Sequence, residues 1–467
     1  MYSTLVAAPP VIWKNNRIKR SHSIRYLGIY IDDKTNWNSH IRHLSNKATT
    51  LHQNLLKIAG PSWGISRKHR LVLYKTVIER VLAHGVSAWC LNPTSKMARK
   101  LDTIQRRFLL AISGAYRTTP TAALQVILGL PPLHLKLKSE AELVTLLRLR
   151  KNIPNHIHAP EDFEETETGW SSHPSCHLHP DQISIQDGGN LMVTKAIYTD
   201  GSKLEKGVGA AFCLLEDGVI KHTWCTKLRS ENTVFQAELL ALKEAVQYAL
   251  PMASKTIKIF TDNKASILAV SNPKSPNKMA RTVFNILLQH PNIHLNWIKA
   301  HVGYFGNETA DALAKEAAES QSSPSILKLS KAFLKSSLRK SMLNAWQKLW
   351  TKGDTGRSTH TIIPTVSLQP ANWSRDDIIF FTGHGPFQFY LKRFNLSTTS
   401  TCPCGLEGTP LHYATECLFT ISWHMKKPAP QHTDQWLQNV ASNPNSKSRL
   451  RSIIQHIHHN QPLFRPD

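Results

Sequence analysis

Four acidic residues stand out in the middle of the sequence because each begins or ends a predicted regular element. Asp200 and Asp262 each end a short apolar segment, while Glu238 and Asp311 lie near the starts of two predicted helices. Taken alone, each residue is more often an ordinary turn or surface carboxylate. Taken together they are candidate ligands for a hard cation such as Mg²⁺ or Mn²⁺, because such ions prefer oxygen ligands.

The elements that must position these residues alternate between strands and helices. Alternating or β-branched residues predict strands, and apolar residues at helical spacing predict helices. The strands are expected near 196–200, 208–215, 219–227, 257–261 and 293–297, and the helices over 234–250 and from about 307. A strand–helix–strand order fits a crossover to a parallel neighbour, which places Asp262 at a carboxyl end where open α/β sheets bind ligands. We expect Gly201 to turn the chain after Asp200.

Glu238 and the segment before Asp311 carry further chemical information. Glu238 lies at the edge of the apolar helix face, where a carboxylate is costly unless it is paired or bound to metal. His301 lies in a glycine-containing loop that includes Gly303 and Gly306. In this order and spacing, the motifs over 193–320 resemble the type 1 ribonuclease H family.

The resemblance implies an α/β fold with a five-stranded mixed sheet flanked by helices. It implies that the RNA strand of an RNA–DNA hybrid is cut endonucleolytically, leaving 5′-phosphate and 3′-hydroxyl ends. In this family two Mg²⁺ (or Mn²⁺) ions about 3.5–4 Å apart activate water and stabilise the leaving oxygen. Asp200 would bridge both ions, with Glu238 and Asp262 on one side and Asp311 on the other. His301 matches the loop histidine that assists proton transfer or product release, although it could be an ordinary loop residue.

Discrimination of RNA from DNA requires contacts with 2′-hydroxyl groups. The candidates for nucleic-acid contact are Gly201, Ser202, Gln236, Asn263 and Asn307. The cellular members of the family often have paired Asn residues shortly before the helix Glu. Here those positions are Val234 and Phe235, so the details of the substrate contacts differ from theirs.

The charge of the chain favours a polyanionic partner. The 57 Lys and Arg against 32 Asp and Glu leave a net charge of +25. Residues 1–153 hold 25 basic and 6 acidic residues (+19), whereas residues 193–320 hold 15 and 12 (+3). We expect the basic N-terminal region to contact nucleic acid, the alternative being helices with soluble basic faces.

Cysteine content and hydropathy bear on the cellular setting. Seven cysteines are an odd and sparse set, which argues against a disulfide scaffold and for a reducing compartment. The sequence contains no apolar run of about 18 residues that would span a membrane, and its first residues do not resemble a secretory signal. We therefore expect an intracellular protein, nuclear or cytoplasmic, rather than a secreted one.

The N-terminal region contains Tyr30-Ile31-Asp32-Asp33, which mimics the Tyr-x-Asp-Asp signature of polymerases. The neighbouring Tyr-Leu-Gly-Ile segment, with Trp37 and His40, instead resembles the element after the palm in reverse transcriptases of non-LTR retrotransposons. The helices that follow, to about 153, resemble the thumb and connecting region. We therefore expect a C-terminal fragment of a retrotransposon polyprotein that lacks polymerase activity.

Two groups of Cys and His residues could bind metal. Cys402, Cys404, His412 and Cys417 supply three thiolates and one imidazole, a set that suits tetrahedral Zn²⁺, although free buried thiols are the alternative. The spacing resembles the small Cys/His module that follows the nuclease in these retrotransposon proteins. The histidines and cysteine of 173–179 have no paired cysteine, and we interpret them as part of a solvated linker.

The sequence thus predicts an embedded ribonuclease H, with a non-catalytic nucleic-acid-binding remnant as the alternative. The expected segments are a post-palm and thumb- or connection-like region 1–153, a linker 154–192, the ribonuclease H domain 193–320, a basic helical connector 321–380, a zinc-knuckle-like module 381–425 and a tail 426–467.

Overall fold

The computed structural model describes residues 11–18, 21–60, 63–189, 193–253 and 255–464, and these form two compact units. The α/β unit comprises residues 143–338, and the helical unit combines residues up to 142 with those from 339 onward. The sequence predicts a run of consecutive segments instead. The difference arises because helices from both ends of the chain share one hydrophobic core, which sequence patterns do not reveal.

The α/β unit is built on a mixed sheet with the strand order β5-β10-β9-β6-β7-β8. Strands β6, β7 and β8 form an antiparallel meander, while β9 pairs in parallel with both β6 and β10. The bounds are β5 Ile183–Ser184, β6 Lys195–Leu204, β7 Gly207–Glu216, β8 Val219–Leu228, β9 Ile257–Thr261 and β10 Ile293–Trp297. The mixed sheet agrees with the prediction, but the count of five strands is wrong, because two residues of the expected linker pair with β10 as β5.

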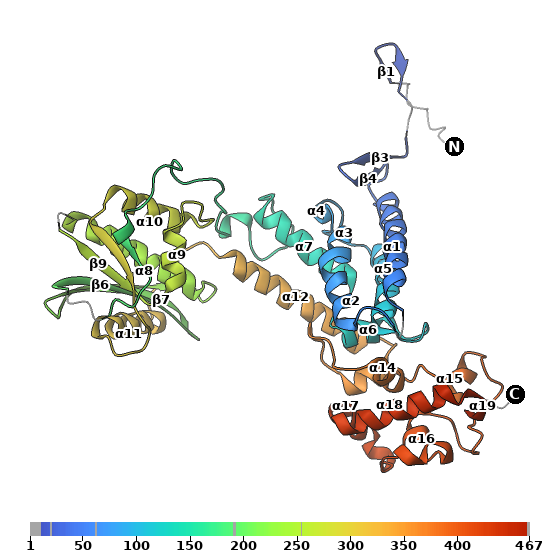
Figure 1. The fold of residues 1–467 in the computed structure, drawn as a ribbon. Helices are drawn as coiled ribbons and strands as arrows, with labels where there is room; N and C mark the ends of the chain where they lie inside the picture. The colour runs from blue at the N-terminus through green and yellow to red at the C-terminus, as the bar shows by residue number, and fades with distance from the viewer. Residues whose placement is uncertain (1–10, 19–20, 61–62, 190–192, 254, 465–467) are drawn as a thin grey trace. The chain divides into compact units, whose positions relative to one another are not determined.

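Helices cover both faces of this sheet (Figure 1). Helices α8 (Val234–Ala249), α9 (Lys264–Val270) and α10 (Lys278–Gln289) lie on one face, and α11 (Phe305–Glu319) lies on the other. Side chains from the sheet and from α8 and α10 fill the core of the first face; they include Ile197, Ile259, Leu295, Leu242, Val246 and Val283. The alternating residues of each strand thus place apolar side chains against both helical layers.

Gly201 does not turn the chain as expected. Strand β6 continues straight through Asp200 and Gly201 to Leu204. A Cβ atom at Gly201 would lie 2.5 Å from the backbone nitrogen of Glu238. The glycine is therefore required for the close approach of β6 to the start of α8.

Residues 154–189, which the sequence predicts to be linker, pack against the α/β unit. Phe163 is completely buried in a cluster of apolar side chains. The guanidinium of Arg281 donates hydrogen bonds of 3.2 Å and 2.8 Å to the carbonyl oxygens of Thr168 and Gly169. The polar composition of this segment predicts solvent exposure. It does not reveal that backbone carbonyls of the segment accept hydrogen bonds from Arg281, a buried residue of α10.

Arg281→Met should release this segment. The variant loses the charged donors to two carbonyl groups, and we expect the free energy of unfolding to fall by about 2 kcal/mol. Limited proteolysis should then cut within residues 163–171. Lys278→Met, which changes an exposed residue of the same helix, is the matched control. Equal protease resistance of the two variants would contradict this account of the segment.

The boundaries between the two units along the chain fall within two long helices, α7 (Leu133–Leu147) and α12 (Lys331–Lys352). The other elements of the helical unit before α7 are β1 Ile12–Trp13, β2 Asn16–Arg17, β3 Ser23–Tyr26, β4 Ile29–Asp32, α1 Asn38–Ile58, α2 Arg67–Leu73, the π-helix Tyr74–Ile78, α3 Glu79–Leu82, α4 Val86–Trp89, α5 Ser95–Ser113 and α6 Thr121–Leu128. Those after α12 are α13 Arg357–Ile362, α14 Arg375–Thr382, α15 Gln388–Arg393, α16 Pro410–Thr415, α17 Thr433–Ser442, α18 Pro444–His459 and α19 Gln461–Phe464.

The core of the helical unit joins residues from both ends of the chain. Trp346 and Trp350 of α12 are almost completely buried in the same cluster as Leu101, Phe108 and Leu124. Near the N-terminus, β3 and β4 form a hairpin, and the helical stretch that begins with α2 is interrupted at Gly85, where φ is 60°.

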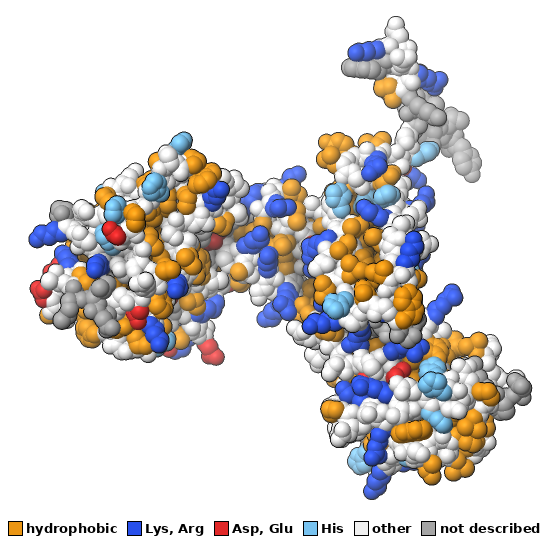
Figure 2. All heavy atoms as spheres, viewed as in Figure 1, with side chains coloured by type: hydrophobic (Ala, Val, Ile, Leu, Met, Phe, Trp, Pro, Cys, Tyr) orange, Lys and Arg blue, Asp and Glu red, His pale blue; other side chains and the backbone are white. Residues whose placement is uncertain are grey.

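The surface of the helical unit is basic on the face that Figure 2 shows. Lys and Arg side chains are spread over it, and few Asp or Glu side chains are visible. Among the helices that the structure describes, none combines the length and the apolar character needed to cross a membrane.

Candidate active site

The sheet and helix α8 bring three of the predicted carboxylates together. Strands β6 and β9 are parallel neighbours in which Thr199 pairs with Thr261, so Asp200 and Asp262 follow at the same end of the sheet. Glu238 reaches them from the first turns of α8. One ligand oxygen from each of the three lies within 4.8 Å of the others. The side chains of Asp200 and Glu238 are almost completely buried, at 6% and 4% exposure.

Polar neighbours orient this carboxylate triad, which we define as Asp200, Glu238 and Asp262. Asn307 Nδ2 donates to Asp262 Oδ2 at 3.3 Å, and the indole nitrogen of Trp297 donates to the Asp262 carbonyl oxygen at 2.9 Å. Among the described residues, the buried Oε2 atom of Glu238 finds no hydrogen-bond donor. A buried carboxylate oxygen without a donor fits a cation site, because an unpaired buried charge is otherwise strongly unfavourable.

Burial and mutual repulsion raise the pKa values of the triad. Burial, together with the charges of Asp262 and Asp311, raises the pKa of Asp200 to about 7. Burial and the neighbouring aspartates Asp200 and Asp262 raise the pKa of Glu238 well above its usual value. Burial also raises the pKa of Asp262, against the opposing effect of the Asn307 amide. Three carboxylates therefore cannot all ionise here at neutral pH without a compensating cation.

Asp311, the fourth predicted carboxylate, belongs to a neighbouring group. Its ligand oxygen lies within 4.8 Å of ligand atoms from His301 and Glu308, and it accepts a 2.6 Å hydrogen bond from Lys315. The charge of Asp311 still acts on Asp200 and raises the pKa of that carboxyl. Sequence reasoning missed Glu308, although its position three residues before Asp311 on a predicted helix places both side chains on one face.

His301 is exposed in the loop between β10 and α11. Its backbone lies in the left-handed region with φ of 54°, and Gly303 follows with φ of 88°. This conformation is uncommon for non-glycine residues, although histidine adopts it more often than most. The loop brings the His301 imidazole within 4.8 Å of ligand atoms of Glu308 and Asp311.

The five predicted nucleic-acid contacts fall into two classes. Ser202 and Asn263 are partly exposed beside the triad, and Asn263 also caps helix α9. The others are buried. Gly201 lies against α8, Asn307 binds Asp262, and Gln236 is engaged through its side-chain amide with Glu164 and the carbonyl of Lys328. The expectation that Gln236 contacts a 2′-hydroxyl does not fit the structure, because its side chain is 2% exposed and its amide donors are already used.

Comparison with known proteins identifies this part of the chain. The family model described as RNase H matches residues 193–319. The chain carries an RNase H domain. The predicted resemblance is therefore confirmed, and the matched residues include strands β6 to β10, helices α8 to α11 and the carboxylate triad.

The chain is also similar to proteins of R1 retrotransposable elements. It is 29% identical over 121 residues to a Pol polyprotein of element R1 4 from Nasonia vitripennis, covering 26% of this chain and 31% of that protein. It is 31% identical over 132 residues to a putative 115 kDa protein in element R1DM from Drosophila melanogaster, covering 28% and 13%. A Pol polyprotein of element R1 from Popillia japonica is 26% identical over 193 residues, covering 41% and 78%. The chain spans less than a third of the first two relatives.

The N-terminal aspartates contact different partners. Asp32 is buried at the end of β4, where its Oδ1 accepts a 2.9 Å hydrogen bond from the backbone of Asn36. Asp33 is exposed and lies 3.2 Å from the ring nitrogen of His22. These contacts favour a structural role for the pair at the end of the hairpin.

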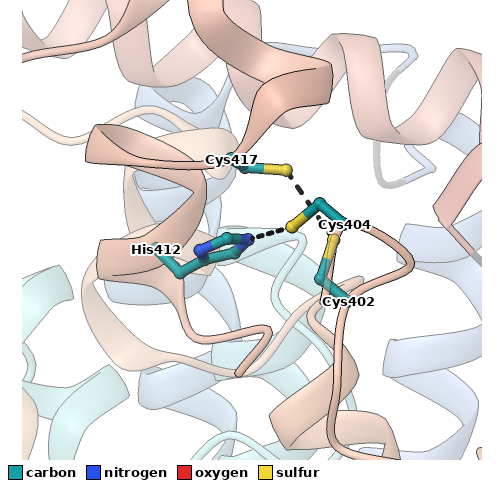
Figure 3. A group of neighbouring side chains, drawn as sticks. All are labelled: Cys402, Cys404, His412 and Cys417. Carbon is teal, nitrogen blue, oxygen red and sulfur yellow. Dashed lines mark hydrogen bonds between the residues drawn. The ribbon is translucent and has the colours of Figure 1, made fainter. Parts of the chain in front are cut away.

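A second candidate metal centre lies in the helical unit. Cys402, Cys404, His412 and Cys417 point toward one another (Figure 3), and their ligand atoms all lie within 4.8 Å. The sulfur atoms of Cys402 and Cys417 are 3.7 Å apart, and Cys404 Sγ is 3.2 Å from His412 Nε2. Tetrahedral Zn²⁺ with Zn–S bonds of about 2.3 Å places its sulfur ligands about 3.8 Å apart. The donor set and its spacing thus fit zinc.

The carboxylate triad should make the stability of the metal-free protein depend on pH. Asp200, with a pKa of about 7, keeps a proton that the unfolded chain releases near its ordinary value of 3.8. Raising the pH from 5 to 8 therefore favours unfolding until the carboxyl is ionised. We expect Tm measured in chelator to fall over this interval, and to fall less in Asp200→Asn. Parallel pH profiles for the two proteins would contradict the assigned pKa. Added Mg²⁺ should raise Tm at pH 8 in the unmodified protein only.

Proposed function

We propose that the RNase H domain hydrolyses the RNA strand of RNA–DNA hybrids endonucleolytically by a two-metal-ion mechanism. The observation that carries the proposal is the convergence of Asp200 of β6, Glu238 of α8 and Asp262 at the carboxyl end of β9. One buried oxygen of Glu238 has no hydrogen-bond donor among the described residues. Folds of this type place ligands at such strand ends. The match of residues 193–319 to the RNase H family supports the same reaction class.

The donor set determines which ions fit. All the groups of the triad are carboxylates, which favour Mg²⁺ or Mn²⁺ over softer metals. Asp200, Glu238 and Asp262 would hold one ion, and Asp200 with Asp311 the second. Bound at these residues, the ions would supply an activated water and stabilise the charge on the leaving oxygen.

The remaining residues act by orientation and proton handling. Asn307 and Trp297 fix the side chain and the backbone of Asp262, respectively. The backbone amide of Gly201 and the side chain of Asn263 oppose the rise in the pKa of Glu238 and so favour its charged form. His301, exposed beside Asp311, is placed to exchange a proton with the solvent or to assist product release.

The biological setting that we propose follows from the relatives. Their names place them in R1 retrotransposable elements. In such an element the domain would remove template RNA after reverse transcription. The helical unit would contribute nucleic-acid binding, as its excess of basic residues over 1–153 indicates.

Asp262→Asn should abolish cleavage while leaving the fold intact. The substitution removes a ligand charge but keeps the size of the side chain and the indole contact with the backbone. We expect the full chain with Mg²⁺ to cut only the RNA strand of an end-labelled hybrid, sparing RNA–RNA and DNA–DNA duplexes. Activity should fall by a factor of about 10³ or more in the variant, and a chelator should stop it.

A folded protein that binds the hybrid without cutting it would favour the alternative, a non-catalytic nucleic-acid-binding remnant. Asp217→Asn, which changes a hairpin residue between β7 and β8, is the control and should cleave normally.

We also propose that Cys402, Cys404, His412 and Cys417 bind one Zn²⁺. The support is the mutual approach of the four donor atoms, three of them sulfur and one an imidazole nitrogen. Thiolates are the form in which cysteine binds zinc. Zinc here would tie the loop of Cys402 and Cys404 to helix α16.

Elemental analysis should find one zinc ion per native chain. Cys404→Ser should lose the metal and lower the thermal stability, because the zinc contributes directly to folding. Cys225→Ser, which alters an exposed cysteine of β8, should retain it. Native protein without bound zinc would contradict the zinc proposal and would leave the nuclease proposal unchanged.

A further inference from the structure

A segment that precedes the RNase H match, residues 182–189, runs beside β10 toward the loop that carries His301. It is anchored by Gln182, whose buried amide donates to the carbonyl oxygens of Leu287, His290 and Ile293 at 2.9–3.3 Å. Strand β5 then pairs with β10, and the Gly188 amide donates to the Trp297 carbonyl at 3.0 Å. The segment therefore follows β10 to its last residue.

Asp187 extends this contact from the strand into the loop. Its Oδ1 accepts hydrogen bonds from the backbone amides of Gly189 at 3.1 Å and Lys299 at 3.3 Å. Its Oδ2 accepts a 3.2 Å hydrogen bond from the Tyr304 hydroxyl. The bond from Gly189, with those from Lys299 and Tyr304, lowers the pKa of Asp187, so the carboxylate is charged at neutral pH. One side chain thus holds both ends of the loop 299–304.

The ring of Tyr304 is also fixed by close packing against the backbone of Gly189. A Cβ atom at Gly189 would lie 1.8 Å from the Tyr304 ring, so the ring packs directly on the glycine backbone. Between the two anchored residues Lys299 and Tyr304 lies His301, with its left-handed backbone at φ of 54°. This conformation is uncommon for a non-glycine residue. The residues that flank it in the loop, Lys299 and Tyr304, are both contacted by a segment outside the matched domain.

We propose that Asp187, through Lys299 and Tyr304, is a positioning residue for His301. The proposal rests on the proposed nuclease function. The catalytic unit of this chain then begins near Gln182 rather than at residue 193. The segment 182–189 contributes to the active site by positioning the loop of His301. Loss of the carboxylate would leave the fold and the metal ligands in place but free the His301 loop.

The test uses full-length Asp187→Ala with Mg²⁺ and an RNA–DNA hybrid. We expect kcat to fall about 10- to 100-fold, because small displacements of catalytic groups have effects of this size, while KM stays the same. Amide hydrogen exchange at Lys299 should become faster. Asp181→Ala, which changes an exposed residue just before the segment, one that pairs with His179 rather than with the loop, is the matched control and should behave as the unmodified chain. Gly189→Ala should reproduce the loss by displacing the Tyr304 ring.

The double variant Asp187→Ala/His301→Ala identifies the route of the effect. If Asp187 acts through His301, the double variant is no slower than His301→Ala alone. Multiplied losses, or full activity in Asp187→Ala, would overturn the proposal while leaving the nuclease intact. An unmodified chain that does not cleave the hybrid would refute the nuclease and with it the catalytic role of Asp187. Hydrogen exchange at Lys299 would still decide whether Asp187 holds the loop.

Discussion

The burial of three carboxylates at one point is the constraint on which the α/β unit depends. Asp200 and Glu238 are almost excluded from solvent, and burial, together with repulsion from neighbouring carboxylates, raises the pKa values of both and of Asp262. An apolar core alone would not hold such a group together. The parallel pairing of β6 with β9 and the close approach of α8 to Gly201 bring the three carboxylates together. The packing of the surrounding structure offsets the unfavourable energy of this arrangement.

The polar residues around the triad interact with its carboxylates in different ways. Asn307 and Trp297 donate hydrogen bonds that orient Asp262, whereas Glu238 Oε2 has no donor among the described residues. The His301 group is different, because it lies in an exposed loop that has little packing of its own. The residues that flank it, Lys299 and Tyr304, contact Asp187 and Gly189, which are remote in sequence.

The helical unit imposes a second constraint on the chain. Its core includes residues from α5 and α6 together with residues from α12, α14 and α18, so neither end of the chain completes that core by itself. The RNase H domain lies between these two portions in the sequence. The Cys/His cluster belongs to the same core, since Cys402 and Cys417 are buried with it. The basic N-terminal helices and the C-terminal module are therefore parts of one unit rather than separate arms.

The sequence by itself determined the RNase H domain, its mixed sheet and its four carboxylates, because strand and helix periodicity and the order of short motifs are local properties of the chain. It also singled out His301 and the four Cys/His residues. The tertiary structure decided what depends on distant partners. Gly201 serves a close approach rather than a turn, Gln236 is buried against Glu164, and residues 154–189 pack instead of forming a linker. In each case the deciding contact joins residues at least 36 positions apart, where no periodicity connects them.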